Sequence, residues 1–210
     1  MLNKNSLILF QGDSITDTGR TGSADPAASL GHGYPAKIAE TLANNYADLG
    51  LTVVNRGISG NRTWDLLDRW DKDCIDIKPD YFSLLIGVND TWRRYDSGMI
   101  TTAEEYEANM RTLLDRVVKE TGAKIILLNI FLLDVTEEKA QMRPDLVEKQ
   151  AVIAKLVEDY DVIYIDVQKK FDEMVANGTP MTDLSEDGVH PSDFGHKVIA
   201  ELWLNAVGLN

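Results

Sequence analysis

The sequence has little of what marks disulfide-stabilised or metal-binding proteins. It contains one cysteine, Cys74, and three histidines in 210 residues. One cysteine cannot build a disulfide framework, which suits a reducing compartment. Cys74 lies in a helix-like stretch without histidine, so we interpret it as a small buried apolar residue. Because the histidines are dispersed along the chain, we expect no metal site.

Long apolar runs and positive charge are also scarce. No run approaches the roughly 20 apolar residues that a membrane-spanning helix needs. Residues 1–5 lead into the first predicted strand without the apolar core and cleavage site of a secretion signal, so we expect a cytoplasmic protein. With 21 Lys and Arg against 34 Asp and Glu, the net charge is -13. Such a chain repels nucleic-acid phosphates and anionic membranes, which disfavours both as partners.

What is present is the composition of an ordinary globular domain. Hydrophobic residues make up 44% of the chain and charged residues 26%, and this length can bury a full core without disulfides or metals. The sequence has no repeat, no low-complexity tract and no linker rich in Pro, Gly or Ser. We therefore predict a single domain spanning residues 1–210.

Short β-branched runs alternate with segments of helical periodicity. The runs that predict buried strands lie at 7–10, 51–54, 81–86, 124–131 and 162–165. Helices are predicted at 34–47, 63–75, 146–159 and 193–207, and after a capping box at 102–105. The acidic region 134–148 is predicted to be a solvated loop leading into a helix. This alternation predicts an α/β protein of three layers, α/β/α, with a five-stranded parallel sheet.

Glycine-rich and polar motifs follow the first three predicted strands. They read Gly-Asp-Ser at 12–14, Gly-Ile-Ser-Gly-Asn at 57–61 and Gly-Val-Asn-Asp at 87–90. The carboxyl ends of parallel strands meet at one edge of a sheet, so we expect these motifs to lie together. There a glycine N–H, an asparagine amide and the N–H of the serine would form an oxyanion hole.

A carboxylate and an imidazole lie three residues apart near the end of the chain, in Asp187 and His190. These are the groups that turn a serine hydroxyl into a nucleophile, so we interpret the chain as a serine hydrolase. Each motif alone also fits an ordinary turn, cap or structural loop. Their joint occurrence in this order favours the enzyme. The other two histidines, His32 and His196, are weaker candidates for substrate contact.

The four motifs, which span nearly the whole chain, resemble those of the SGNH or GDSL-type esterases and acetylhydrolases. The resemblance implies a flavodoxin-like fold, the SGNH hydrolase fold, and no metal or organic cofactor. It assigns Ser14 as nucleophile, His190 as general acid and base, and Asp187 as the residue that orients the imidazole. It also implies oxyanion-hole donors from the N–H groups of Ser14 and Gly60 and from the Asn89 side chain. Isoleucine at position 15 replaces the leucine of the family motif.

Longer stretches at 12–17, 55–61 and 86–93 are similar to intracellular acetyl-xylooligosaccharide (acetylxylan) esterases. This similarity implies an O-acetylated sugar or short oligosaccharide as substrate, and a homo-oligomer. We place Asp13, Trp92 and Arg93 with the substrate-binding residues, because Trp92 and Arg93 directly follow the third motif and an indole can stack on a sugar. The alternatives are that Asp13 braces its loop, that Trp92 covers the core edge and that Arg93 pairs with an acid. Arg62 and Trp64 are weaker candidates.

Other functions remain open at this point. Within the hydrolases, the chain could be a lysophospholipase or thioesterase that acts on longer acyl chains. In a different class, the hydroxyl-rich segment 16–21 resembles the phosphate loop of flavodoxins, which bind FMN for electron transfer. A carbohydrate-binding module without activity would not need a nucleophile, a base and oxyanion donors together. No long apolar loop predicts a lipid groove.

Overall fold

The computed structural model describes residues 2–22 and 28–209; the two ends of the predicted domain, residues 1 and 210, lie outside the described residues. Five strands form one parallel sheet in the order β2-β1-β3-β4-β5. Their bounds are β1 Leu7–Gly12, β2 Thr52–Asn55, β3 Tyr81–Leu85, β4 Lys124–Leu128 and β5 Val162–Ile165. This order is the flavodoxin-like one, so the predicted fold class is confirmed.

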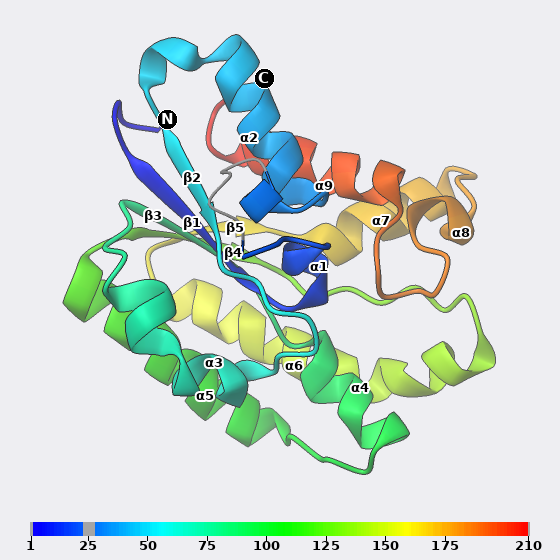
Figure 1. Cartoon of the computed structure of the whole chain (residues 1–210). Helices are drawn as coiled ribbons and strands as arrows, with labels where there is room; N and C mark the ends of the chain where they lie inside the picture. The colour runs from blue at the N-terminus through cyan, green and yellow to red at the C-terminus, as the bar shows by residue number, and fades with distance from the viewer. Residues whose placement is uncertain (1, 23–27, 210) are drawn as a thin grey trace.

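Helices cover both faces of the sheet, which gives the three layers seen in Figure 1. Helices α2 and α9 pack against each other on one face, and α3, α5 and α6 form the layer on the other. The α-helices are α1 Ser14–Asp17, α2 Tyr34–Asn45, α3 Thr63–Asp68, α4 Val88–Asp96, α5 Ala103–Arg116, α6 Glu137–Asp159, α7 Val167–Ala176, α8 Met181–Leu184 and α9 Asp193–Ala206. Short 3-10 turns lie at Ala28–Leu30 and Ala47–Leu49, and π-helical turns at Asp71–Ile75 and Val117–Thr121.

Side chains of the central strand β3 point alternately to the two faces of the sheet and contribute to the core on both. Successive residues of a strand point to opposite faces. Phe82 meets Trp70 edge to face, with ring centroids 5.5 Å apart. The next residue, Ser83, accepts a hydrogen bond from the indole N–H of Trp203 on α9 at 3.1 Å. The strand is therefore buried on both faces, as its continuous apolar run predicts.

The prediction of a solvated loop leading into a helix at residues 134–148 is right for the start of this region and wrong for the rest, which is helical and partly buried. Helix α6 begins at Glu137, capped by Thr136, and continues through Pro144. Within it Asp145 and Lys149 form a buried ion pair, with Oδ2 and Nζ 2.6 Å apart. The charged residues and the proline hide the apolar periodicity of this half of the helix. Helices α4, α7 and α8 were also not predicted, because they are short and rich in polar residues.

The strand order decides where chemistry can occur. The chain moves from β1 to one edge of the sheet at β2 and then back across to β3. The loops after β1 and β3 therefore diverge, and open α/β sheets bind ligands in the crevice at this switch point. Across the described residues, no helix is long and apolar enough to cross a membrane.

Candidate active site

Ser14 lies at this switch point, as the first residue of the four-residue helix α1. Asp13 caps the helix, because its side chain accepts a hydrogen bond from the N–H of Ile15 at 3.0 Å. The N–H groups of a first helical turn lack partners inside the helix. Among the described residues, none accepts a hydrogen bond from the Ser14 N–H. A hydroxyl group and a backbone N–H without a partner thus come from the same residue.

The loop between α8 and α9 brings His190 to Ser14 from 176 positions away. Oγ of Ser14 lies 2.9 Å from Nε2 of His190. On the other side of the ring, Nδ1 lies 2.7 Å from Oδ2 of Asp187. The second carboxylate oxygen, Oδ1, accepts hydrogen bonds from the N–H groups of Val189 and His190 at 2.9 and 2.7 Å. With a proton on Nδ1, the imidazole presents Nε2 as a base to the serine hydroxyl.

The electrostatics of the pair follow from these contacts. Burial acts to raise the pKa of Asp187, but hydrogen bonds from the ring and backbone of His190 and from Val189 bring it below its usual range. The hydrogen bond to Asp187 in turn raises the pKa of His190 above its ordinary value. The carboxylate is therefore ionised at neutral pH and stabilises an imidazolium when one forms.

Gly60 and Asn89 lie in the loops that follow β2 and β3. Gly60 has φ 83°, and the space that a Cβ would fill is open, so its backbone can approach a ligand closely. Nδ2 of Asn89 donates to the Asn61 carbonyl at 3.1 Å, and Oδ1 accepts from the Arg93 guanidinium at 3.4 Å. These two contacts fix which way the amide faces. Because Nδ2 carries two hydrogens, one remains for an anion.

Two carboxylates, those of Asp17 and Asp90, hold the loops after β1, β2 and β3 in place. The sequence motifs do not specify which residues these carboxylates contact. Asp17 accepts hydrogen bonds from the N–H and Oγ of Ser59 at 2.9 and 2.7 Å, which ties α1 to the loop of Gly60. Asp90 accepts from the Thr63 hydroxyl at 2.6 Å, which ties the start of α4 to α3. Burial raises the pKa of Asp90 to about 6. Both carboxylates lie inside or beside the sequence motifs, which is the only signal that could have found them.

The candidates for substrate contact occupy different places. Trp92 is half-buried beside His190, with ring centroids 5.9 Å apart. Arg93 pairs with Asp96 and holds the Asn89 amide, so it positions another residue. Asp13 is only 1% exposed and lies beneath Ser14, where burial raises its pKa to about 7. Contact with substrate does not fit this burial, whereas the loop-bracing alternative does.

Arg62 and Trp64 lie at the start of α3. The Arg62 guanidinium stands over the Trp64 ring, 5.0 Å from its centroid, and also pairs with Asp65. Trp64 is exposed. These contacts are made within one short helix, and no contact in the described structure links either residue to Ser14 or His190.

The remaining histidine and cysteine candidates are structural. His196 is buried and accepts a hydrogen bond from the N–H of Tyr34 at 3.2 Å, and burial lowers its pKa to about 4. Cys74 is buried, as expected, and burial raises its pKa to about 12. Within residues 2–22 and 28–209, no group of three or more His, Cys, Asp or Glu side chains could hold a metal ion.

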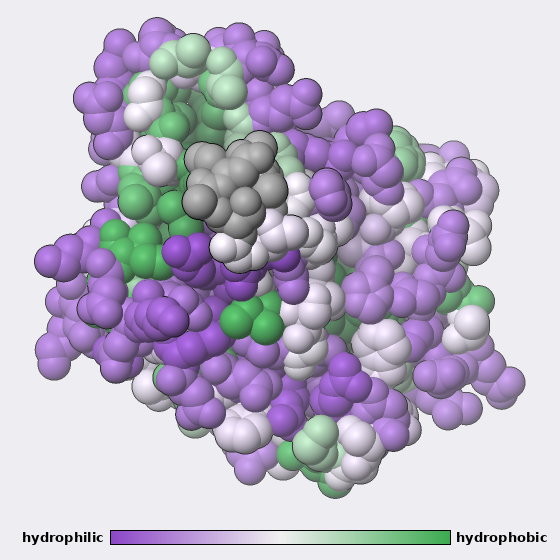
Figure 2. Space-filling model, viewed as in Figure 1, coloured by the Kyte–Doolittle hydropathy of each residue, from purple (hydrophilic) through white to green (hydrophobic). Residues whose placement is uncertain are grey.

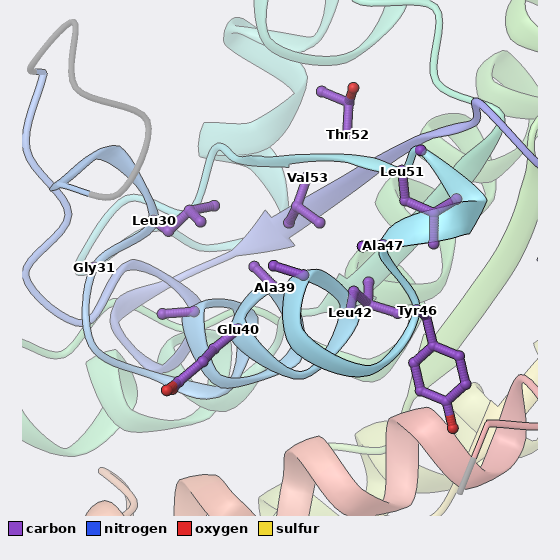
Figure 3. A pocket seen from close by; sticks show the side chains of 13 residues that line it. Leu30, Gly31, Ala39, Glu40, Leu42, Tyr46, Ala47, Leu51, Thr52 and Val53 are labelled. Atoms are coloured by element: carbon purple, nitrogen blue, oxygen red, sulfur yellow. The ribbon is translucent and has the colours of Figure 1, made fainter.

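A cavity of about 790 Å³ lies apart from this site, between α2 and the edge strand β2. Figure 2 shows apolar surface at this place, and Figure 3 shows the side chains of both elements that line the cavity. None of Ser14, Asp187 and His190 lines it. The site at the switch point is therefore separate from this apolar hollow.

Comparison with known proteins gives consistent matches. The sequence model of the GDSL-like Lipase/Acylhydrolase family matches residues 10–198. An acetylxylan esterase of Geobacillus stearothermophilus is 37% identical over 207 residues, covering 96% of this chain and 93% of that protein.

Solved structures are similar over the whole chain. A candidate GDSL-like lipase from Parabacteroides merdae matches with a TM-score of 0.93 at 37% identity, covering 100% of this chain and 99% of the other. A catalytic mutant of Axe2, an acetylxylan esterase from Geobacillus stearothermophilus, matches with a TM-score of 0.91 at 35% identity, covering 100% and 97%. That mutant replaces a serine by alanine, and two further catalytic mutants of Axe2 replace a histidine and an aspartate.

Proposed function

Because this chain belongs to the GDSL-like lipase/acylhydrolase family and is a carboxylic ester hydrolase, we propose that it removes acetyl groups from xylose-based oligosaccharides through an acyl-enzyme. The observation that carries the mechanism is the unbroken line of contacts from Ser14 Oγ through the imidazole of His190 to the carboxylate of Asp187. The catalytic mutants of Axe2 remove the same three residue types from a related protein.

Acylation begins at Ser14. Nε2 of His190 accepts the hydroxyl proton as Oγ attacks the ester carbonyl, and the carbonyl oxygen becomes negative. The N–H groups of Ser14 and Gly60 and the remaining N–H of Asn89 stabilise this oxygen. The imidazolium then donates its proton to the alkoxide of the sugar as the C–O bond breaks, which leaves acetyl-Ser14 and a free alcohol.

Deacylation reverses the roles of the same groups. His190 removes a proton from a water molecule, which attacks the acetyl carbonyl, and the oxyanion donors act a second time. The tetrahedral intermediate collapses to acetate, and the proton returns from His190 to Oγ. Asp187 stays ionised throughout, since its pKa lies below its usual range. Each step uses groups of this chain and water.

The preference for acetyl esters of sugars rests on two observations. The curated relative that matches along 96% of this chain is an acetylxylan esterase. The apolar cavity between α2 and β2 does not include Ser14, Asp187 or His190 among its lining residues, so it offers these three residues no apolar pocket for a long acyl chain. A short acyl group and a polar alcohol fit such a site better than a fatty acyl chain does.

The test compares the wild type with Ser14→Ala on p-nitrophenyl acetate, butyrate and octanoate and on acetylated xylo-oligosaccharides. We expect the wild type to hydrolyse p-nitrophenyl acetate faster than the butyrate and octanoate esters and to release acetate from the oligosaccharides. The rate in Ser14→Ala should fall by about 10³- to 10⁶-fold. Thr112→Ala, which removes an exposed hydroxyl on α5, serves as the control and should keep wild-type rates. Equal activity in Ser14→Ala would reject the nucleophile, and a preference for octanoate would move the substrate to lipids or thioesters.

A further inference from the structure

A buried lysine contacts the wall of the active site. Lys139, on α6, is only 6% exposed, and its Nζ stands 3.5 Å from the centroid of the Trp92 ring. Trp92 in turn lies against His190, with the two rings tilted by 52°. Ammonium, indole and imidazole therefore form a contiguous row that starts on α6 and ends at the proposed general base. The proposed mechanism does not use the first two groups.

The place of Lys139 is unfavourable for a cation. It is the third residue of α6, and the positive end of the helix dipole repels an ammonium there. Its one ion pair among the described residues is with the exposed Glu138, at 3.7 Å, and an exposed partner stabilises little. Burying an ammonium is costly unless a partner compensates. The indole of Trp92 is the close partner, through a cation–π contact.

Trp92 faces one particular half of the substrate. His190 must reach Oγ of Ser14 first and the oxygen of the departing alcohol afterwards, so the alcohol lies on the side of the imidazole. The proposed oxyanion donors, Gly60 and Asn89, lie on the side of Ser14 to which the carbonyl oxygen of the ester points. A ring packed against His190 therefore borders the alcohol. One face of that ring is already covered by Lys139 and is not open to a sugar.

We propose that Lys139 is a positioning residue: its ammonium holds the Trp92 indole beside His190, so that the ring forms a fixed wall for the sugar half of the ester. The proposal rests on the proposed function, since it takes the alcohol to be a sugar. Lys139 itself does not touch the reacting atoms. It acts through Trp92, and also through its charge on the imidazole.

The charge of Lys139 adds a second effect at His190. Four titratable groups act on this ring or lie near it. They are Asp187 on its own loop, Asp13 beneath Ser14, Lys139 on α6 and His196 on α9. The hydrogen bond to Asp187 raises the pKa of His190 most, Asp13 adds to this, and Lys139 opposes both. Removing the ammonium should let His190 hold its proton to higher pH.

The test uses Lys139→Met, which keeps the aliphatic stem and removes the charge, and Lys139→Arg, which keeps a cation. Lys155→Met on the same helix is the matched control, because Lys155 is exposed and pairs with Glu107 away from the site. Each protein is assayed on p-nitrophenyl acetate, whose leaving group departs without a proton, and on acetylated xylobiose, whose alkoxide needs one. Thermal unfolding of each variant is recorded in parallel.

We expect Lys139→Met to lose about 10-fold in kcat/KM on acetylated xylobiose and less than about 3-fold on p-nitrophenyl acetate at the pH plateau. The contact distances put the ammonium within roughly 10 Å of the imidazole, so the acidic limb of the pH profile should move up by about 0.5 to 1 pH unit. Lys139→Arg should restore both readouts, and Lys155→Met should match the wild type.

If Lys139→Met loses equally in kcat/KM on both substrates and its pH limb does not move, the proposal is overturned and Lys139 is a structural residue. A lowered melting temperature as the only effect would lead to the same conclusion. An unchanged variant would overturn it too. If the wild type does not deacetylate xylobiose, the proposed function fails and the sugar wall fails with it. The pH limb on p-nitrophenyl acetate then tests only the charge effect of Lys139 on His190: a shift supports that effect, and no shift rejects both parts of the proposal.

Discussion

Replacing Gly188 by alanine should damage the catalytic loop more than its small size suggests. Gly188 has φ 82°, in the left-handed region, and its carbonyl accepts a hydrogen bond from the Leu133 N–H at 2.9 Å. A Cβ at this position would lie closer to the Leu133 carbonyl oxygen than the 3.0 Å that Cβ atoms keep. That oxygen belongs to backbone, so it cannot rotate away as a flexible side chain would.

The magnitude has two parts. An alanine in the left-handed region costs about 1 to 2 kcal/mol, and relieving an overlap inside packed structure costs about 1 to 3 kcal/mol more. For a domain of this size, a loss of about 2 to 5 kcal/mol lowers the melting temperature by roughly 4 to 20 °C. Gly188 lies between Asp187 and His190 in the chain, so the shift also moves these two residues relative to Ser14. A displacement of about 1 Å there is expected to cost about 100-fold in kcat/KM.

Gly122→Ala provides the matched control for this experiment. Gly122 has φ 70°, but a Cβ added there would meet open space; it lies at the end of a π-helical turn, far in sequence from Ser14, Asp187 and His190. Its alanine variant should show the conformational cost alone, about 1 to 2 kcal/mol, with wild-type kcat/KM. Differential scanning calorimetry and p-nitrophenyl acetate kinetics on both variants separate the two parts. If Gly188→Ala lost no more stability than Gly122→Ala and kept its activity, the assigned overlap would be wrong.

Three further expectations concern the reacting groups. Asn89→Ala removes one oxyanion donor and should lower kcat about 10²- to 10³-fold with little change in KM; an unchanged kcat would remove Asn89 from the oxyanion hole. Asp187→Asn should lower kcat about 10⁴-fold, because an amide no longer selects the tautomer with its proton on Nδ1; retention of a tenth of the activity would contradict this. In the proposed mechanism only neutral His190 acts as base, and the hydrogen bond to Asp187 raises the pKa of that histidine above its ordinary value. The rise of kcat/KM with pH should therefore occur at a higher pH than the titration of a free imidazole. In Asp187→Asn the rise of kcat/KM should move to lower pH. A stopped-flow pH series measures this, and a rise at the same pH as in the wild type would contradict the expectation.

The parts of the fold and site that sequence predicts are those set by local pattern. Each buried strand appears as a short apolar run, and the place of Ser14 and Asn89 follows from strand ends meeting at one edge of the sheet. The spacing of Asp187 and His190 lets one loop hold both groups, which the 2.7 Å contact agrees with. These inferences need only chain order and periodicity.

The rest depends on contacts between distant segments. Lys139 has the pattern of an exposed helix residue in an acidic region, and its partner Trp92 lies 47 positions earlier in the chain. The burial of Asp13 beneath Ser14 is likewise invisible in a motif that also fits an exposed turn. Hydrophobic periodicity indicates which face of a helix or strand is apolar. It does not predict which charged residue becomes buried when another helix packs against that element.

The long separation in sequence between Ser14 and His190 has a consequence for when activity arises during synthesis. During synthesis the ribosome delivers Ser14 and the Gly60 and Asn89 loops long before residue 190, so the growing chain carries the proposed nucleophile without the proposed base. The last loop is held to the rest of the fold by hydrogen bonds that include those of Ser192 with Asp183 and Leu184 and of Gly188 with Leu133. Hydrolytic competence should therefore arise only late in synthesis, and release of this loop alone should abolish it even where the sheet is intact.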